Sequence, residues 1–379
     1  MRPLPEYPPY RVARPPDGKR WLSAGALMVL LCGVGGALLR SAGSGAELVI
    51  KGMACALVVM GVLWLIRLLY YRMSAHNARY YEQLVEQQQQ AWWEQHQYRF
   101  ALSDMVLLGP AGTDTPHWLR LLKREHRVPE IKNEPSGKAL RIGRTLVDTV
   151  AEREALLAKM LVLQWQTQRA DSSLPQLWRC YWQGSLKGWR AFCTQMQISF
   201  PDVALPEKPE AWQGEETLSA LAATAQTLSE KTVILVAGCH SIAASFNSAQ
   251  PAGESAALCL VAQRGLVSLT RGEVYDIAGK EVLTAVCERA EQQSELENPP
   301  DACMLFSQPT LPALAQSGWN VTHHVQDLNW GNPGDMEMLI VLLLAALYAK
   351  NNQEPCGWIA KDPLHTLALG IIKPYGEGK

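Results

Sequence analysis

The chain has 379 residues, enough for two to three domains and a full hydrophobic core. Its 35 Lys and Arg against 36 Asp and Glu leave a formal charge of -1, which excludes a basic nucleic-acid binder. Nine Cys without a Cys-x-x-Cys pair or a Cys/His ligand spacing indicate neither a zinc site nor a disulfide framework. We therefore expect no nucleic-acid partner, no metal and a reducing compartment around the soluble part.

Residues 1–20 are rich in proline, which lacks the backbone N–H that helices and sheets require. We expect an extended, polyproline-like cytoplasmic tail. One interpretation is a PxxP ligand for a protein partner. The interpretation we favour is a solvated tail whose arginines bind the anionic headgroups of inner-membrane lipids.

Residues 21–72 are expected to form a transmembrane helical hairpin. Trp21 to Leu39 carry no charge, and at about 1.5 Å per residue they approach the hydrocarbon thickness of a bilayer, roughly 30 Å. A Ser/Gly-rich turn follows Arg40, and a second apolar run covers 52–66. A cleaved signal peptide would explain the first run alone, so the second run directly after it favours the hairpin.

Basic residues flank the two apolar runs unevenly. Five Lys and Arg precede the first run and three follow the second up to Arg79, whereas the region between them holds two. Lys and Arg near membrane ends are retained in the cytoplasm. We therefore expect a two-pass protein of the bacterial inner membrane with both termini cytoplasmic.

Residues 73–98 contain neither Gly nor Pro. This composition predicts a juxtamembrane helix that continues out of the membrane as far as Tyr98. Residues 99–212 are expected to form a first α/β half. Here the sequence predicts strands at 100–108 and 177–181 and helices at 117–123, 149–168 and 188–196. A proline-containing loop at 199–212 separates this half from the next.

Residues 213–379 are expected to form a second α/β half. The predicted elements are helices at 215–229, 282–293 and 335–350, strands at 232–237, 255–262 and 302–306, and a strand hairpin within 357–372. Gly265 and Gly272 bracket a further short hairpin. The last helix is apolar all round from Met338 to Tyr348, so it must be buried on all sides, and it is too short to span a bilayer.

The second half contains a succession of stretches that a known family shares: TVILVAGCHS at 232–241, AGESAALCLVAQRG at 252–265 and NPGDMEMLIVLLLAALYAKNNQEP at 332–355. A G-E-x-A-A motif opens the second stretch, with Gly253, Glu254, Ala256 and Ala257. In these features the chain resembles thiolase-like proteins, in particular β-ketoacyl synthases. The resemblance weakens before Glu215 and is absent from the hairpin.

This resemblance implies a cytosolic thiolase-like layered αβαβα domain. Together with the apolar runs, we therefore expect an α/β protein in which the two-helix transmembrane hairpin precedes that domain. The all-apolar helix would then lie between two sheets. Because proteins of this fold commonly dimerise, the resemblance also implies a homodimer.

For chemistry, the resemblance argues against activity. Ketosynthases place a nucleophilic Cys at the start of the helix before the first matched strand, where this chain has Gly214 to Leu218 without a Cys. They also place a His in the turn before the buried helix, where this chain has Asn332-Pro333-Gly334. We therefore expect no catalytic residue at either position and no cofactor.

Cys239 and His240 are the strongest alternative catalytic candidates, because a Cys beside a His can be an activated nucleophile. However, neighbours in an extended strand point to opposite faces. We therefore favour structural roles for both residues.

His323 and His324, with Asp327 and Asp335, are candidates for general-base or metal-binding work. Adjacent histidines are poor co-ligands in a strand, and no third well-spaced ligand is evident. No phosphate loop of the G-x-x-x-x-G-K-[ST] type occurs in the chain.

Two functions remain. The first is an inner-membrane-anchored, catalytically inactive scaffold or adaptor with a protein partner. The amino-acid sequence as a whole resembles proteins encoded with type VI secretion clusters of enterobacteria. This resemblance suggests a role in effector loading or assembly, with a secretion component or effector as partner. The second is a membrane-associated enzyme that modifies acyl thioesters or lipids, with Cys239 as a displaced nucleophile.

Overall fold

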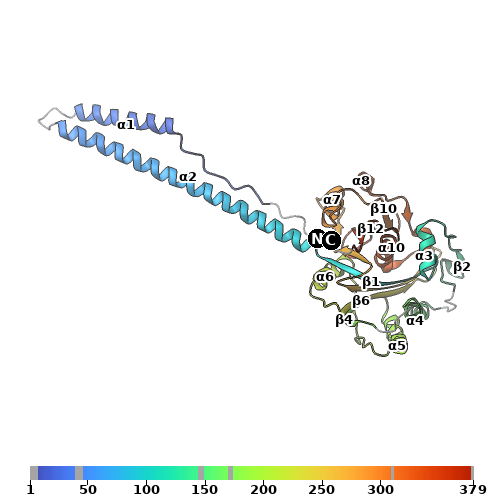
Figure 1. The fold of residues 1–379 in the computed structure, drawn as a ribbon. Coiled ribbons are helices and arrows are strands. Elements are labelled where there is room, and N and C mark those ends of the chain that lie inside the picture. Colours follow the sequence, from blue (N-terminus) through green and yellow to red (C-terminus); the bar gives the residue numbers. More distant parts are fainter. Residues whose placement is uncertain (1–6, 39–45, 144–148, 170–173, 309–310, 377–379) are drawn as a thin grey trace. The chain divides into compact units, whose positions relative to one another are not determined.

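The computed structural model describes residues 7–38, 46–143, 149–169, 174–308 and 311–376. It divides into two units, Arg2–Trp92 and Trp93–Lys379 (Figure 1). The turn expected between the two apolar runs and the first six residues of the tail lie outside the described residues.

The N-terminal unit contains two helices, α1 (Gly18–Leu38) and α2 (Ala46–His96). Among the described residues, one helix is long and apolar enough to cross a membrane by length and composition, within Val49–His96. The helix predicted for 73–98 is the continuation of α2. Both helices expose many large apolar side chains.

The described part of the proline-containing tail lies along α2. The Ala13 N–H donates to Ser74 Oγ at 2.9 Å, and the Tyr81 hydroxyl donates to the Pro8 carbonyl at 2.9 Å. The Arg67 guanidinium donates to the Arg14 carbonyl at 3.0 Å. Side chains of α2 therefore satisfy backbone groups that the proline-rich sequence cannot pair in a helix or a sheet.

The C-terminal unit begins with seven strands and their helices, which we call the first half. Its elements are β1 (Arg99–Leu108), α3 (Thr115–Leu122), β2 (Lys132–Glu134), β3 (Gly137–Ala139), α4 (Val150–Gln168), β4 (Gln176–Gln183), α5 (Leu186–Ser199), β5 (Glu210–Ala211), α6 (Glu215–Ala225), β6 (Thr232–Ser241) and β7 (Glu254–Ala262). The short strands β2 and β3 form a separate hairpin. Side chains of Asp114, Thr149 and Ser185 cap α3, α4 and α5 by accepting backbone N–H bonds, which explains where these helices begin.

The second half follows. Its elements are β8 (Val267–Thr270), β9 (Glu273–Tyr275), α7 (Leu283–Gln293), β10 (Ala302–Leu305), α8 (Pro312–Gln316), β11 (His324–Val325), α9 (Asp327–Trp330), the 3-10 turn η1 (Gly334–Met336), α10 (Glu337–Asn352), β12 (Cys356–Ala360) and β13 (Leu367–Pro374).

The two halves repeat one topology. In the first half the strand order is β5-β4-β6-β7-β1, and in the second it is β11-β10-β12-β13-β8. Each is the order third, second, fourth, fifth, first, with parallel pairing among the third, second and fourth strands and antiparallel pairing from the fourth to the first. In this repeat α6 and α10 hold equivalent places, before the fourth strand of each half.

The layers of this unit follow from its three main apolar clusters (Figure 1). The helices α4 and α5 pack on the outer face of the first half, and α7 and α8 pack on the outer face of the second. The helices α6 and α10 lie between the halves, and all but four residues of α10 are buried. The burial expected for Met338 to Tyr348 is thus confirmed, although Tyr348 itself is only partly buried.

Three features differ from the sequence-based expectation. The sequence predicted two separate sheets, but the strands of both halves form one continuous sheet, because β8 pairs with β1 as well as with β13. The hairpin expected between Gly265 and Gly272 is wrong, since β8 and β9 both pair with β13. The topological boundary lies between β7 and β8, later than the expected division at 212, because the loop 199–212 joins two elements of the same half.

Candidate functional site

A cavity of about 450 Å³ lies where the two buried helices begin. Its described lining consists of Gln183, Trp212, Gly214, Gln250, Phe306, Ser307, Asn332, Pro333, Gly334, Asp335, Glu337, Met338, Lys361, Asp362 and Pro363. The topological repeat explains this set. Segments that follow the second and fourth strands of each half meet the amino ends of α6 and α10, so both halves contribute equivalent positions.

The cavity therefore joins the two segments that the ketosynthase resemblance matched, 214–218 and 332–334. Gly214 has φ +65° and Gly334 has φ +53°, which is the left-handed region that favours glycine. A Cβ on Gly214 would collide with Asp362, and a Cβ on Gly334 would collide with the ring of His240. Both turns are therefore built for glycine at the mouth of the cavity.

Glu215 is the first residue of α6 and is 7% exposed. Its backbone N–H donates to Asp362 Oδ1 at 2.9 Å, and its Oε1 has no hydrogen-bond partner among the described residues. Burial raises the pKa of this carboxyl to about 7, against a smaller lowering by the Arg271 guanidinium. Glu215 is thus a buried acid that titrates near physiological pH.

Glu337 is the first residue of α10 and is equally buried. Its Oε1 accepts the Lys361 backbone N–H at 3.0 Å, and its Oε2 lies 3.7 Å from Lys361 Nζ. Burial raises the pKa of Glu337 too, and the contacts with Lys361 oppose that rise. The two equivalent helices therefore begin with equivalent buried acids, of which Glu337 has the fuller set of partners.

Cys239 lies on β6 and is fully buried. Its thiol contacts the Glu154 backbone carbonyl at 3.4 Å, on the side of β6 that α4 covers. Burial holds the pKa of this thiol well above its usual value, so at neutral pH it is a thiol rather than a nucleophilic thiolate.

His240, the next residue, places its ring against Gly334 on the turn that leads into α10. Its Nδ1 lies 3.8 Å from Glu154 Oε1, and its Nε2 is buried without a hydrogen-bond partner among the described residues. Burial lowers the pKa of His240, while Glu154 and Asp335 oppose the shift. His240 is therefore neutral near pH 7 and sits beside the cavity, although it does not line it.

The other histidine candidates lie elsewhere. His323 Nδ1 is 2.9 Å from the Asn320 amide nitrogen, and the His324 ring packs edge-on against Tyr348. Burial, together with the Arg124 charge, lowers the pKa of His324 to about 4. Within the described ranges no three His, Cys, Asp or Glu side chains gather as metal ligands.

The G-E-x-A-A motif has a structural explanation. Glu254 opens β7 with a fully buried carboxylate, which accepts bonds from Arg153 at 2.9 Å, Ser241 at 3.2 Å and the Ile142 N–H at 3.1 Å. Arg141 bridges the same carboxylate, at 3.5 Å, to Glu134 on β2. A buried charge is tolerated only when paired in this way, so the motif ties the β2–β3 hairpin to the sheet.

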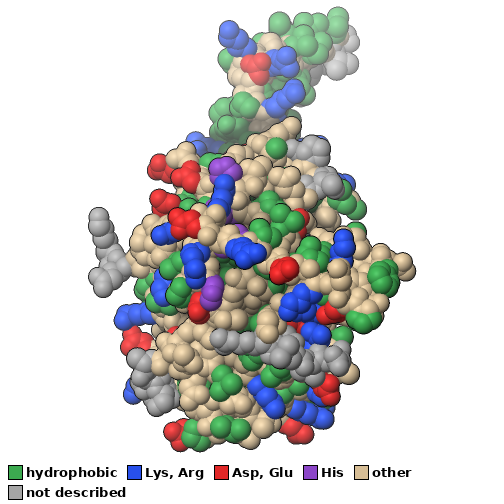
Figure 2. All heavy atoms as spheres, turned by 90° about the vertical axis from the view of Figure 1, so that its right-hand side faces the viewer, with side chains coloured by type: hydrophobic (Ala, Val, Ile, Leu, Met, Phe, Trp, Pro, Cys, Tyr) green, Lys and Arg blue, Asp and Glu red, His purple; other side chains and the backbone are tan. Residues whose placement is uncertain are grey.

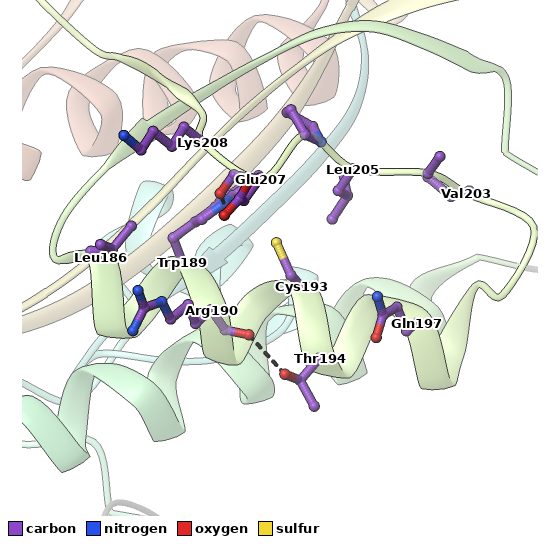
Figure 3. A pocket seen from close by; sticks show the side chains of 12 residues that line it. Leu186, Trp189, Arg190, Cys193, Thr194, Gln197, Val203, Leu205, Glu207 and Lys208 are labelled. Carbon is purple, nitrogen blue, oxygen red and sulfur yellow. Dashed lines mark hydrogen bonds between the residues drawn. The ribbon is translucent and has the colours of Figure 1, made fainter.

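A second hollow, of about 610 Å³, lies away from this cavity, between α5 and the extended segment 203–208 (Figure 3).

A third surface feature is the face that carries α3 and β2, where Lys, Arg and His side chains gather beside apolar ones (Figure 2). There the segment 120–132 contributes five exposed cations together with the exposed Val128 and Ile131. None of these cations forms an ion pair with a residue that the structure describes.

Sequence reasoning found the two turns of the cavity but missed the acids Glu215 and Glu337 and the contact of His240 with Gly334. An acid at the first position of a helix is the ordinary choice, so it gives no functional signal. The equivalence of the two acids appears only once the topology shows that α6 and α10 are counterparts.

No family model and no curated protein matches the sequence. Among solved structures, the chain is similar to ketosynthase twelve of the bacillaene polyketide synthase of Bacillus amyloliquefaciens, with 11% identity, a TM-score of 0.50, and coverage of 75% of this chain and 76% of that one. It is also similar to the ishigamide ketosynthase/chain length factor, with 15% identity, a TM-score of 0.49, and coverage of 73% of this chain and 99% of that one. A third similar structure is MvaS in complex with 3-hydroxy-3-methylglutaryl coenzyme A, with 14% identity, a TM-score of 0.42, and coverage of 74% of this chain and 84% of that one. The first likeness shows the fold alone, and the fold is α/β and thiolase-like.

Proposed function

We propose that this protein is an inner-membrane-anchored, catalytically inactive thiolase-like scaffold or adaptor. One observation carries the proposal. The cavity at the amino ends of α6 and α10 is formed, yet none of its described lining residues is a Cys or a His. The described lining therefore lacks the thiolate and the imidazole that ketosynthase-type acyl transfer needs.

The candidate enzyme residues support the same conclusion. The Cys239 thiol faces α4 and is fully buried, so its thiolate is disfavoured at neutral pH. His240 packs against the cavity turn, and His323 bonds to Asn320 on the surface. An acyl-thioester or lipid-modifying enzyme with Cys239 as nucleophile remains the second candidate, and it would require β6 and α4 to separate.

Acyl transfer to the protein is directly measurable. The full chain, reconstituted in lipid nanodiscs, is incubated with acetyl and longer acyl thioesters of N-acetylcysteamine and analysed by intact-mass spectrometry. We expect no covalent acyl adduct above that of a Cys239→Ala control. An adduct on Cys239 at neutral pH would overturn the inactive scaffold and establish the second candidate.

A partner would engage exposed surfaces of the C-terminal unit. The basic face at 120–132 is one such surface, and general similarity to proteins encoded with type VI secretion clusters suggests a secretion component or effector as its partner. The test is affinity capture from native membranes with the wild type and with an Arg124→Glu, Arg127→Glu variant. The proposal requires a partner that is reproducibly lost with the variant, while abundance stays unchanged.

The membrane part of the proposal is a two-pass hairpin with both termini cytoplasmic. The apolar stretch within Val49–His96 and the excess of Lys and Arg outside the two runs support it. Reporter fusions at the N-terminus and after Arg79 should both report cytoplasm. A periplasmic signal from the second fusion would place the thiolase-like unit outside and contradict a cytosolic partner.

The homodimer implied by the resemblance belongs to the proposal as well. Analytical ultracentrifugation of the nanodisc-free unit Trp93–Lys379 should show twice the monomer mass. A monomer at micromolar concentration would restrict the scaffold to a single copy.

A further inference from the structure

The hollow between α5 and the segment 203–208 is a groove with two chemically different ends (Figure 3). Arg190 and Lys208 lie at one end, on opposite walls, beside Leu186. Val203 and Leu205 lie at the other end. Cys193 projects from α5 into the middle, towards the segment.

The groove is part of the rigid fold. Trp189 packs on Phe192 with ring centroids 5.6 Å apart, and its Nε1 donates to the Glu207 carbonyl at 3.2 Å, which ties the segment to α5. Val203, Leu205 and Cys193 are half-buried and continue the apolar cluster beneath α4 and α5. The volume of about 610 Å³ falls in the range of small-molecule sites, roughly 300 to 1,000 Å³.

The two cations at the groove have no ion-pair partner among the residues that the structure describes. Neither Arg190 nor Lys208 forms an ion pair or a side-chain hydrogen bond with a residue that the structure describes, and both side chains are exposed. Glu207, the carboxylate among the lining residues, lies nearer the middle of the groove in Figure 3. Two free cations beside an apolar channel complement a molecule that carries an anion at one end and a hydrocarbon chain at the other.

We propose that this groove binds a medium- or long-chain fatty acid anion. The carboxylate lies between Arg190 and Lys208, and the chain runs past Cys193 towards Leu205 and Val203. The ligand covers the Cys193 thiol. This site is separate from the cavity at α6 and α10, so it goes beyond the proposed scaffold function and stands or falls independently of it.

Cys193 provides the readout. Burial raises the pKa of its thiol to about 11, so alkylation by N-ethylmaleimide is slow but measurable at about pH 9. The full chain in phosphatidylcholine nanodiscs is alkylated with and without dodecanoate, and each Cys is followed by peptide mass spectrometry. We expect dodecanoate to slow the alkylation of Cys193 at least fivefold and to leave that of a small reference thiol, N-acetylcysteine in the same sample, unchanged. Hexanoate should bind more weakly, by roughly two- to fourfold per methylene lost.

Matched variants test the carboxylate. Arg190→Gln with Lys208→Gln should raise the half-saturating dodecanoate concentration by about five- to tenfold, whereas Glu207→Gln should lower it by about two- to threefold. All three side chains are exposed, so the melting temperature should not change, which a thermal scan verifies. Methyl dodecanoate, which has no charge, should respond to none of these changes.

Three results would overturn the proposal. The first is unchanged Cys193 alkylation in the presence of dodecanoate. The second is equal protection in the wild type and in the Arg190→Gln, Lys208→Gln variant, and the third is equal protection by methyl dodecanoate. Either of the last two would show apolar partitioning without recognition of the anion.

Discussion

The two halves of the thiolase-like unit place equivalent helices in different surroundings. Both α6 and α10 precede the fourth strand of their half, begin with a buried Glu, and point their amino ends at the same cavity. However, α6 exposes Glu216, Ala220 and Ala223 to solvent, whereas α10 is buried almost all round. The same topology, repeated twice, can therefore place one helix at the edge of the core with a solvent-exposed face, as in α6, and its counterpart in the middle of the core, as in α10.

The largest effect is expected from a charge in the central helix. Leu343 is 1% exposed, so Leu343→Asp leaves an unpaired carboxylate in an apolar site at a cost of several kcal/mol. That approaches the whole stability of a typical domain, roughly 5 to 15 kcal/mol. The fragment Trp93–Lys379, expressed without the N-terminal unit, should be soluble and melt cooperatively as wild type and should aggregate as Leu343→Asp.

The matched control is Ala223→Asp on the exposed face of α6, which should cost less than about 1 kcal/mol. The comparison breaks if the two variants behave alike. A wild-type fragment that needs detergent would instead make α10 a membrane element and would contradict a buried central helix.

The glycines at the two helix starts should give the next largest effect. Gly334→Ala and Gly214→Ala each combine left-handed backbone strain with a steric collision, and we expect a loss of about 2 to 3 kcal/mol for each in denaturant unfolding. Because the Gly334 collision is with a side chain, His240→Ala should restore part of the loss. Gly143→Ala, whose Cβ meets nothing within 4 Å, is the neutral control. If the Gly334→Ala, His240→Ala double variant loses as much stability as Gly334→Ala alone, backbone strain rather than the collision with His240 causes the whole loss.

The two buried acids should differ in their dependence on pH. The pKa of Glu215 rises from 4.5 to about 7 on folding, so the folded state binds this proton more tightly. Stability contributed by Glu215 is therefore present below about pH 4.5 and falls as pH rises through 7, by roughly 3 kcal/mol. Glu215→Gln should remove this slope from urea midpoints measured between pH 5 and 8, and Glu337→Gln should remove less. Unchanged slopes in Glu215→Gln would place the titration elsewhere.

The smallest effect is expected at Cys239. Cys239→Ala removes a buried thiol and should cost about 1 kcal/mol, with no loss of biological function at normal abundance. A complementation assay paired with immunoblotting measures both quantities. Loss of function in a folded, abundant variant would favour the enzyme over the scaffold.

Much of the secondary structure was predictable, because local patterns decide it. Asp114 and Thr149 cap helices that begin within two residues of the starts predicted at 117 and 149, and the alternation of strands and helices indicated the α/β class. Which strands pair with one another was harder to predict from the sequence. The short strand β8 reads as part of a hairpin, yet it joins both halves through partners distant in the chain, and no local pattern encodes such partners.

For the candidate site, the sequence singled out the segments 214–218 and 332–334, neither of which contains a Cys or a His. It could not show that Glu215 is buried enough for its pKa to approach 7, because an acid in the first turn of a helix is equally common on a surface. It could not place His240 against Gly334 either, since 94 positions separate two residues that only the sheet brings together.

The sequence by itself determined the long apolar run within Val49–His96, the burial of α10 and the absence of Cys and His from the segments 214–218 and 332–334. Each of these depends on residue type along a contiguous stretch, which sets the local free energy of burial. Only the tertiary structure decided that α5 and the segment 203–208 form a groove, that Arg190 and Lys208 lie at one end of it, and that the two halves share one cavity. These depend on contacts between segments far apart in the chain, and contact geometry is set by the packing of the whole unit.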